Sequence, residues 1–238
     1  MEADERALTR SEGAVLSVFG LGYVGCVSAV CFAERGHDVI GVDVDPRKLE
    51  LLRRGVSPII EERIGGLTAE VVSSGRLSVT ADARRAVLDS DVTLVCVGTP
   101  TTRDGSLSTS HLESVTADIG AALQNKTGWH TVVYRSTMLP GTCADLLIPQ
   151  LEQCSGKRAG VDFGVCVNPE FLREGTGVSD FLSPAKTVIG ESDPWSAEVV
   201  AGLYEGLPGH VFRVPLGVAE MIKFIDNSFH ALKVDFAN

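Results

Sequence analysis

A chain of 238 residues with 44% hydrophobic residues is long enough for one large domain with an extensive core. Its net charge of −10, from 21 basic and 31 acidic residues, argues against nucleic acid and anionic membrane surfaces as partners. No apolar run approaches the roughly 18–20 residues that span a bilayer, so we expect no membrane partner.

Residues 1–13 are charged and lack the apolar region of a signal peptide, so they predict a disordered tail. The six cysteines form no Cys-x-x-Cys pair, and several lie in apolar runs, as Cys96 does. Such cysteines are typical of a reducing compartment, and we expect a cytoplasmic protein. The five histidines are scattered along the chain, and we expect no metal site.

The first expected strand, 15–19, ends in a Gly-x-Gly-x-x-Gly motif formed by Gly20, Gly22 and Gly25. A run of small residues with helical character follows, and a second apolar strand, 38–42, leads into Asp43. This context is typical of dinucleotide binding, because the glycines permit a tight turn, close approach of the pyrophosphate and close packing of helix on strand. The alternative is a glycine-rich turn that binds no dinucleotide.

The identity of the dinucleotide follows from the acid after the second strand. The phosphates would lie at the helix N-terminus, where unpaired N–H groups and the helix dipole favour anions. Asp43 can accept hydrogen bonds from both ribose hydroxyls, and it would repel a 2′-phosphate. The pattern therefore favours NAD over NADP.

Strands and helices continue to alternate through most of the chain. Further strands are expected at 77–80, 92–97, 131–134, 163–167, 187–189 and 210–213. Further helices are expected at 46–54, 68–74, 110–123, 143–153 and 193–204. This alternation predicts an α/β fold with a Rossmann-type, doubly wound, mainly parallel sheet that helices cover on both faces.

Ligands of such a sheet bind beyond the carboxyl ends of the strands, where polar segments follow at 98–100, 135–137 and 168–170. Thr137, in the second of these, could bind a cofactor or simply end the strand. Glu170 and Glu174, which flank an arginine after the third strand, could serve in acid–base catalysis or cap the next helix.

The last segment differs from the rest, because its apolar residues predict one long helix from 217 to the end. It has no glycine cap or proline stop, so we expect a chain truncated within this helix, with its partner domain missing. Lys223, Asn227 and His230 share one helix face. Ammonium and amide groups can stabilise an oxygen that becomes negative, although a solvated polar stripe is the alternative.

Together these segments resemble the UDP-glucose/GDP-mannose dehydrogenase family of NAD-dependent nucleotide-sugar 6-dehydrogenases. The matching segments cover nearly everything after the tail, in family order: FGLGYVG (19–25), GVDVDPRKL (41–49), VCVGTP (95–100), RSTMLPGT (135–142), NPEFLREG (168–175), KTVIGE (186–191) and residues 219–238. Segments 57–61, 154–157 and 160–164, with His230, are most similar to the branch that acts on GDP-mannose.

The resemblance implies oxidation of the sugar C6 alcohol to a carboxylate (GDP-mannose to GDP-mannuronate) in two hydride transfers, as a step in polysaccharide biosynthesis. The aldehyde would be held on a cysteine as a thiohemiacetal, oxidised to a thioester and hydrolysed. In the family this cysteine lies in a Gly-Gly-x-Cys-x-Pro-Lys-Asp motif beyond the long helix. None of the six cysteines here has those neighbours, so we expect this chain alone to be inactive in the overall oxidation.

The resemblance also implies residue roles. The NAD site would comprise Gly20, Gly22, Tyr23, Val24, Gly25, Asp43, Lys48, Thr99 and Thr137. Acid–base and hydrolytic chemistry would use Glu174, with Glu170 as second choice, while Lys223 and Asn227 would stabilise the oxyanion. Substrate contacts would come from Phe171, Leu172, Arg173, His230 and Asn238.

These assignments divide the chain into the tail at 1–13, an NAD-binding domain at 14–215 and the start of a long helix at 216–238. Family members build their dimer core from that helix, so we expect a homodimer through it. UDP-glucose remains an alternative substrate. A single-step NAD oxidoreductase is a second alternative, against which the 168–175 segment argues. A non-catalytic NAD-binding or dimerising module is the third, which the missing cysteine keeps open.

Overall fold

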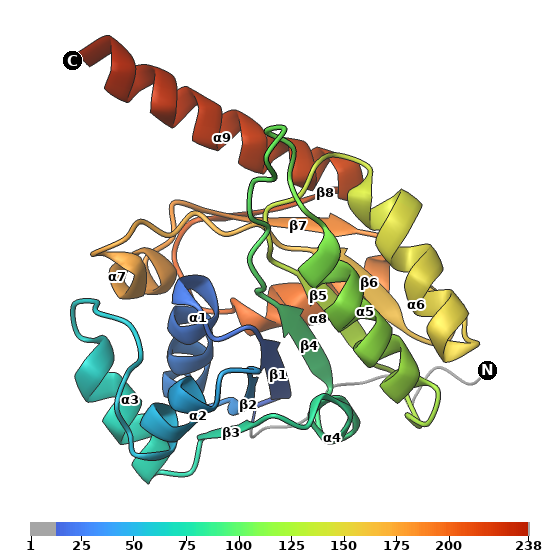
Figure 1. Ribbon diagram of the computed structural model, residues 1–238, viewed down its shortest axis with the longest axis horizontal. Coiled ribbons are helices and arrows are strands. Elements are labelled where there is room, and N and C mark those ends of the chain that lie inside the picture. Colours follow the sequence, from blue (N-terminus) through green and yellow to red (C-terminus); the bar gives the residue numbers. More distant parts are fainter. Residues whose placement is uncertain (1–12, 238) are drawn as a thin grey trace.

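The computed structural model of the chain describes residues 13–237, so nearly all of the predicted tail, and the predicted substrate contact Asn238, lie outside the described residues. The described residues form an eight-stranded sheet in the order β3-β2-β1-β4-β5-β6-β7-β8, with helices on both faces (Figure 1). The strands are β1 (Val15–Phe19), β2 (Asp38–Val42), β3 (Leu77–Thr80), β4 (Val92–Val95), β5 (Thr131–Tyr134), β6 (Gly164–Val167), β7 (Lys186–Glu191) and β8 (His210–Pro215). The helices are α1 (Tyr23–Glu34), α2 (Pro46–Arg53), α3 (Ile64–Ser73), α4 (Ala83–Leu88), α5 (Ser110–Leu123), the π-helix η1 (Cys143–Leu147), α6 (Ile148–Ser155), α7 (Gly177–Leu182), α8 (Pro194–Leu203) and α9 (Leu216–Ala237).

The strand directions confirm the predicted doubly wound, mainly parallel sheet. Strands β1 to β6 run parallel, and the chain returns from the β3 edge to place β4 beside β1. Strand β7 reverses direction: it pairs antiparallel with the end of β6, through Val167 and Gly190, and β8 pairs parallel with β7. The carboxyl ends of β1, β4, β5 and β6 therefore meet at one edge, where ligands of such sheets bind.

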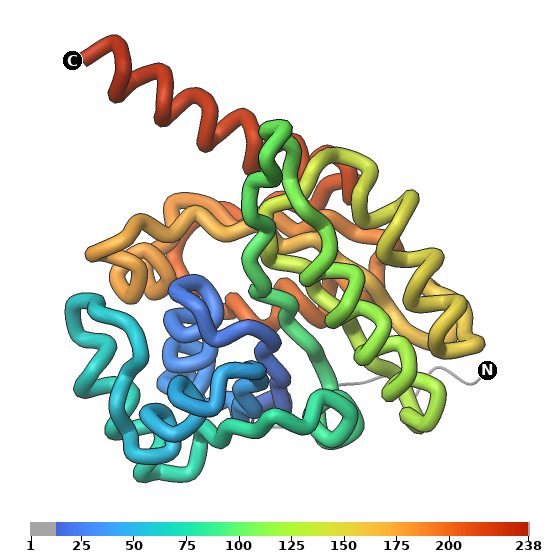
Figure 2. Tube along the Cα trace, in the orientation of Figure 1, coloured from blue at the N-terminus to red at the C-terminus, as the bar shows by residue number. Residues whose placement is uncertain are grey.

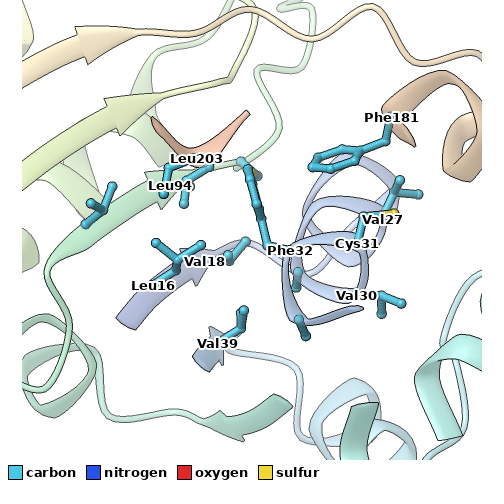
Figure 3. Packing of buried hydrophobic residues seen from close by; sticks show 14 of the residues in the cluster. Leu16, Val18, Val27, Val30, Cys31, Phe32, Val39, Leu94, Phe181 and Leu203 are labelled. Carbon is cyan, nitrogen blue, oxygen red and sulfur yellow. The ribbon is translucent and has the colours of Figure 1, made fainter. Parts of the chain in front are cut away.

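Apolar side chains of the strands alternate between two core clusters. Leu94 of β4 packs in the cluster that includes α1, α3, α7 and α8, while its neighbour Val95 packs in the cluster of α4, α5, α6 and the start of α9. In the first cluster, the ring of Phe32 on α1 meets that of Phe181 on α7 edge to face, with centroids 4.9 Å apart (Figure 3). Helix α1 is thus buried between the sheet and other helices, which explains its apolar composition.

The structure contains two helices beyond those predicted, and a third helix begins earlier than predicted. Helices α4 and α7 were not predicted, because each spans only 6 residues and shows less than two turns of apolar spacing. Helix α3 begins at Ile64 and not at 68, although Gly65 and Gly66 lie in its first turn. Its start follows Arg63, whose φ of 66° lies in the left-handed region, and such a start carries no strong sequence signal.

Helix α9 begins at the residue directly after β8 and packs only through its first turns. Ala219, Glu220 and Lys223 are its buried residues among those described, and every described residue from Asn227 onward is exposed. The tube in Figure 2 shows this second half projecting beyond the sheet. Among the described helices, none combines the length and the apolar character that a membrane span requires.

Candidate functional site

The glycine motif forms a tight turn between β1 and α1. Gly20 has φ +86°, and its N–H donates to Val42 O at 2.8 Å. A Cβ on Gly25 would lie 1.8 Å from Gly20 O, so only glycine lets the first turn of α1 pack this closely. Gly22 is different, because a Cβ there would meet no protein atom within 4 Å.

The space beside Gly22 suits an anionic group. Gly22 is the N-cap of α1, no side chain caps the helix, and the first N–H groups of a helix have no partner within it. The helix dipole adds partial positive charge at the same point. The turn therefore fits the pyrophosphate of a dinucleotide, with Tyr23 and Val24 in the first helical turn.

Asp43 lies at the end of β2 and is almost fully buried beside this turn. Its Oδ2 accepts from Leu21 N at 2.7 Å and from Lys48 Nζ at 3.0 Å, and its Oδ1 accepts from Asp45 N at 2.8 Å. These contacts fix the carboxylate within reach of a ribose bound next to the turn, and they bring Lys48 to the same place.

Thr99 and Thr137 come together beyond the ends of β4 and β5. The hydroxyl of Thr99 donates to the backbone oxygen of Thr137 at 2.7 Å. The glycine turn between β1 and α1 lies at the same edge. A Cβ on Gly20 would lie 3.0 Å from Cα of Val97, which follows β4. The predicted cofactor residues thus gather along one edge of the sheet.

The 168–175 segment brings a carboxylate to α9. Oε1 of Glu170 lies 2.8 Å from Nζ of Lys223, and the two side chains are 12% and 8% exposed. The other oxygen of Glu170 accepts from Leu172 N at 2.7 Å, which fixes the carboxylate against its own segment. Lys223 Nζ also lies 5.5 Å from the ring centroid of Phe171. Glu170 and Lys223, which the sequence suggested as two separate candidates, therefore form one ion pair that is largely shielded from solvent.

The other predicted residues of this region are more open. Glu174 is exposed at the end of the segment, and Asn227 and His230 are exposed farther along α9. Arg173 is exposed as well, and its guanidinium binds Asp180, with Nη2 at 2.6 Å from Oδ1. This hydrogen bond lowers the pKa of Asp180.

A cavity of about 390 Å³ lies beside the segment. Its lining includes Arg135, Asn168, the 170–173 residues, Lys186 and Asp226. Lys186 bonds Asp226 at 2.6 Å and lies 4.3 Å from the ring centroid of Phe171.

Sequence reasoning missed Glu220, which anchors α9. Its carboxylate is buried and accepts from Gly141 N at 2.6 Å and Cys143 N at 2.8 Å, at the start of η1. Burial raises the pKa of Glu220. Its position three residues before Lys223 was the available signal, since such a spacing places both on one helix face.

The cysteines lie mostly inside the core. Burial raises the pKa of the Cys26, Cys31 and Cys96 thiols to about 12, and it raises the pKa of Cys143 and Cys166 as well. Thiols of this kind are poor nucleophiles, because the thiolate is the reactive form. Across residues 13–237 no cluster of three or more potential metal ligands occurs.

Comparison with known proteins gives consistent matches over this region. The NAD-binding domain of the UDP-glucose/GDP-mannose dehydrogenase family matches residues 14–208. The GDP-mannose 6-dehydrogenase of Pseudomonas putida is 51% identical over 223 residues, 94% of this chain and 51% of that protein. The UDP-glucose 6-dehydrogenase AglM of Haloferax volcanii is 40% identical over 94% of this chain and 53% of its own length.

Solved structures agree with these sequence matches. A ternary complex of GDP-mannose dehydrogenase from Pseudomonas aeruginosa superposes with a TM-score of 0.93 at 50% identity, over 94% of this chain and 51% of that one. A UDP-glucose dehydrogenase from Pyrobaculum islandicum superposes with a TM-score of 0.91 at 40% identity, over 98% of this chain and 53% of that one. The chain thus spans about half the length of these relatives.

Proposed function

The chain belongs to the UDP-glucose/GDP-mannose dehydrogenase family and carries its NAD-binding domain. We therefore propose that it is the cofactor-binding half of a nucleotide-sugar 6-dehydrogenase. The proposed reaction oxidises the C6 alcohol of a nucleotide sugar to the carboxylate. The observation that carries the proposal is the buried pair of Glu170 and Lys223, at the edge of the sheet that also holds the glycine turn.

When bound, NAD would supply hydride acceptance in each of the two oxidations at C6. This chain contributes the binding surface. The N-terminus of α1 would hold the pyrophosphate, Asp43 would accept hydrogen bonds from the ribose hydroxyls, and Thr99 and Thr137 would line the site beyond the adjacent strand ends.

Lys223 and Glu170 work on the sugar oxygen. In the first oxidation the C6 hydroxyl loses its proton to Glu170 as the hydride leaves C6, and the Lys223 ammonium stabilises the oxygen while it is negative. Of the two carboxylates, Glu170 has the stronger support, because it contacts Lys223 whereas Glu174 is exposed. Asn227 supports the oxyanion from the next turn of α9, and His230 and the 171–173 residues contact the substrate.

The second oxidation needs a nucleophile. A cysteine thiol adds to the aldehyde, a second hydride leaves C6, and water hydrolyses the thioester to release the carboxylate and the thiol. We place this cysteine outside residues 1–238, because none of the six cysteines has the Gly-Gly-x-Cys-x-Pro-Lys-Asp neighbours of the family nucleophile and burial raises the pKa of five of them. The chain alone is then inactive in the overall reaction.

GDP-mannose is the proposed sugar, with UDP-glucose as the alternative. The GDP-mannose relatives are 50–51% identical to this chain, while the UDP-glucose relatives are 39–40% identical. The proposal extends to a cytoplasmic homodimer assembled through α9 that supplies a sugar acid for polysaccharide biosynthesis.

Two measurements test the proposal. Calorimetry on this chain should detect NAD binding and much weaker NADP binding. The protein encoded by the complete reading frame that contains this chain should form two NADH per GDP-mannose and little NADH from UDP-glucose. One NADH per sugar would indicate a single-step oxidoreductase, and no NADH with intact NAD binding would indicate a non-catalytic module.

A further inference from the structure

Tyr23 connects the cofactor turn to the 168–175 segment. It is the first residue of α1, so its backbone belongs to the turn that receives the pyrophosphate. Its side chain reaches away from that turn, and its hydroxyl lies 2.7 Å from Arg173 O and 2.5 Å from Oε2 of Glu61. A Cβ on Gly177 would lie 2.5 Å from this hydroxyl, so glycine at 177 makes room for the contact.

Glu61 is the centre of this arrangement. It lies between α2 and α3, and its Oε2 accepts from Gly175 N at 2.9 Å in addition to the Tyr23 hydroxyl. Burial and this hydrogen bond raise the pKa of Tyr23, so the tyrosine is protonated and can donate. One carboxylate oxygen therefore joins three stretches of chain: the cofactor turn, the α2–α3 connection and the end of the 168–175 segment.

The opposite side of the segment is held by a second carboxylate. Oδ2 of Asp180 accepts the backbone N–H of Arg173 at 2.9 Å, and the Arg173 side chain binds the same group. Asp180 belongs to α7, whose Phe181 packs against Phe32 of α1, whereas Glu61 contacts Tyr23 in the cofactor turn itself. Charge-assisted hydrogen bonds of this kind are stronger than neutral ones, so Glu61 fixes the segment firmly.

We propose that Glu61 is a positioning residue that couples NAD binding to the placement of the 168–175 segment, through Tyr23. The inference deepens the proposed function and rests on it, since this segment carries Glu170 and the proposed substrate contacts. Cofactor that orders the first turn of α1 also orders Tyr23, whose single hydroxyl proton is shared between Glu61 Oε2 and Arg173 O, while Glu61 accepts from Gly175 N. By linkage, fixing the segment strengthens NAD binding by the same factor.

The test is hydrogen exchange of this chain, followed by mass spectrometry with and without saturating NAD. In the wild-type protein NAD should slow exchange in residues 171–177. Glu61→Ala should speed exchange there by about tenfold or more and abolish the effect of NAD on it, since a charge-assisted hydrogen bond is lost. The Kd of the Glu61→Ala variant for NAD should rise only by a small factor, equal to the factor by which NAD slows hydrogen exchange of residues 171–177 in the wild-type protein.

Three further variants separate positioning from a general structural role. Glu61→Gln, which keeps an oxygen acceptor, should restore most of the protection. Tyr23→Phe loses the contact with Arg173 O but keeps the bond from Gly175 to Glu61, so it should lower the protection of the segment in the free protein less than Glu61→Ala does, and it should remove the effect of NAD. Glu62→Ala changes the adjacent, exposed carboxylate and should behave as wild type.

The outcomes are distinguishable. Wild-type exchange at 171–177 in Glu61→Ala would overturn the inference, and so would faster exchange spread equally over β1 and β5, which would mean general destabilisation. NAD binding to the wild-type chain without any effect on the segment would overturn the inference and leave the proposed function standing. Failure of the wild-type chain to bind NAD would overturn both.

Discussion

Oε1 of Glu220 accepts a hydrogen bond from the backbone N–H of Cys143 at 2.8 Å, which joins the second turn of α9 to the start of the π-helix η1. The second oxygen accepts from Gly141, so the carboxylate occupies two N–H groups where η1 begins. This contact holds α9 against the body of the domain one turn before Lys223.

Replacing this carboxylate should destabilise the fold. Glu220→Ala removes two charge-assisted hydrogen bonds and leaves one buried and one partly buried N–H group unpaired, so we expect a loss of about 2–4 kcal/mol in the free energy of unfolding. Urea unfolding measures the change. Glu50→Ala, at an exposed position on α2, should stay within about 0.5 kcal/mol of wild type. Equal unfolding midpoints for both variants would contradict this role.

Acid stability should depend on His130, which is fully buried between Thr93 and Ser90. Burial lowers the pKa of His130 to about 3. In the unfolded chain the ring takes up a proton near its ordinary pKa of 6.5, so the unfolded state binds more protons below that pH. The stability due to neutral His130 is therefore present above pH 6.5 and lost as the pH falls toward 3.

The His130→Asn variant tests this. The slope of its unfolding free energy between pH 6 and 4 should be smaller than that of wild type by about 1.4 kcal/mol per pH unit. His111→Asn, at an exposed histidine, provides the matched control. If the unfolding free energies of wild type and His130→Asn depend on pH in parallel, the His130 ring is not the source of the acid sensitivity.

Cofactor selectivity should follow Asp43. Asp43→Asn should raise the Kd for NAD roughly 10- to 100-fold, because charge-assisted hydrogen bonds to the ribose contribute about 1.5–3 kcal/mol each. The preference for NAD over NADP should narrow, since the repulsion of the 2′-phosphate disappears. Asp45→Asn keeps the N-cap of α2 and is the control. Titration calorimetry with both cofactors measures the selectivity. An unchanged ratio of the two Kd values in Asp43→Asn would refute the assignment.

The buried pair should show strong coupling in a double-mutant cycle. Lys223→Met leaves the Glu170 carboxylate without its partner and should cost about 3–5 kcal/mol, and Glu170→Leu should cost a similar amount. The double variant should be more stable than the sum of the two changes predicts, because no isolated charge remains. Additive losses in chemical unfolding would mean that the two side chains do not interact.

Self-association should depend on the exposed half of α9. Ile225, Phe229, Leu232 and Phe236 are 59%, 62%, 63% and 91% exposed, and their spacing places an apolar stripe on the helix. We expect a dimer in sedimentation velocity at micromolar concentration and a monomer for the double variant Ile225→Ser/Phe229→Ser. Val44→Ser removes an isolated apolar side chain that is 97% exposed, and it should not change the sedimentation coefficient.

Local patterns predicted the strands and the cofactor turn well, because apolar runs and glycine spacing act over short stretches of chain. The glycines are explained by contacts within the turn, as Gly25 against Gly20 shows. Long-range pairs left no such signal: Glu220 meets Gly141 across 79 positions, and Glu61 meets Gly175 across 114. The choice between Glu170 and Glu174 depended on the path of the segment after β6, which spacing alone does not specify.

The direct connection of β8 to α9 fixes the direction in which each side chain of α9 points around the helix axis. Pro215 ends the strand and Leu216 begins the helix, so no flexible residue lies between the sheet and Lys223. Each residue of an α-helix advances the side-chain direction by about 100°. A single insertion or deletion between 215 and 223 would therefore turn the ammonium away from Glu170 by more than a quarter of a revolution, even though the helix itself would still form. The contact between Lys223 and Glu170 therefore depends on the number of residues along this stretch as much as on their identity.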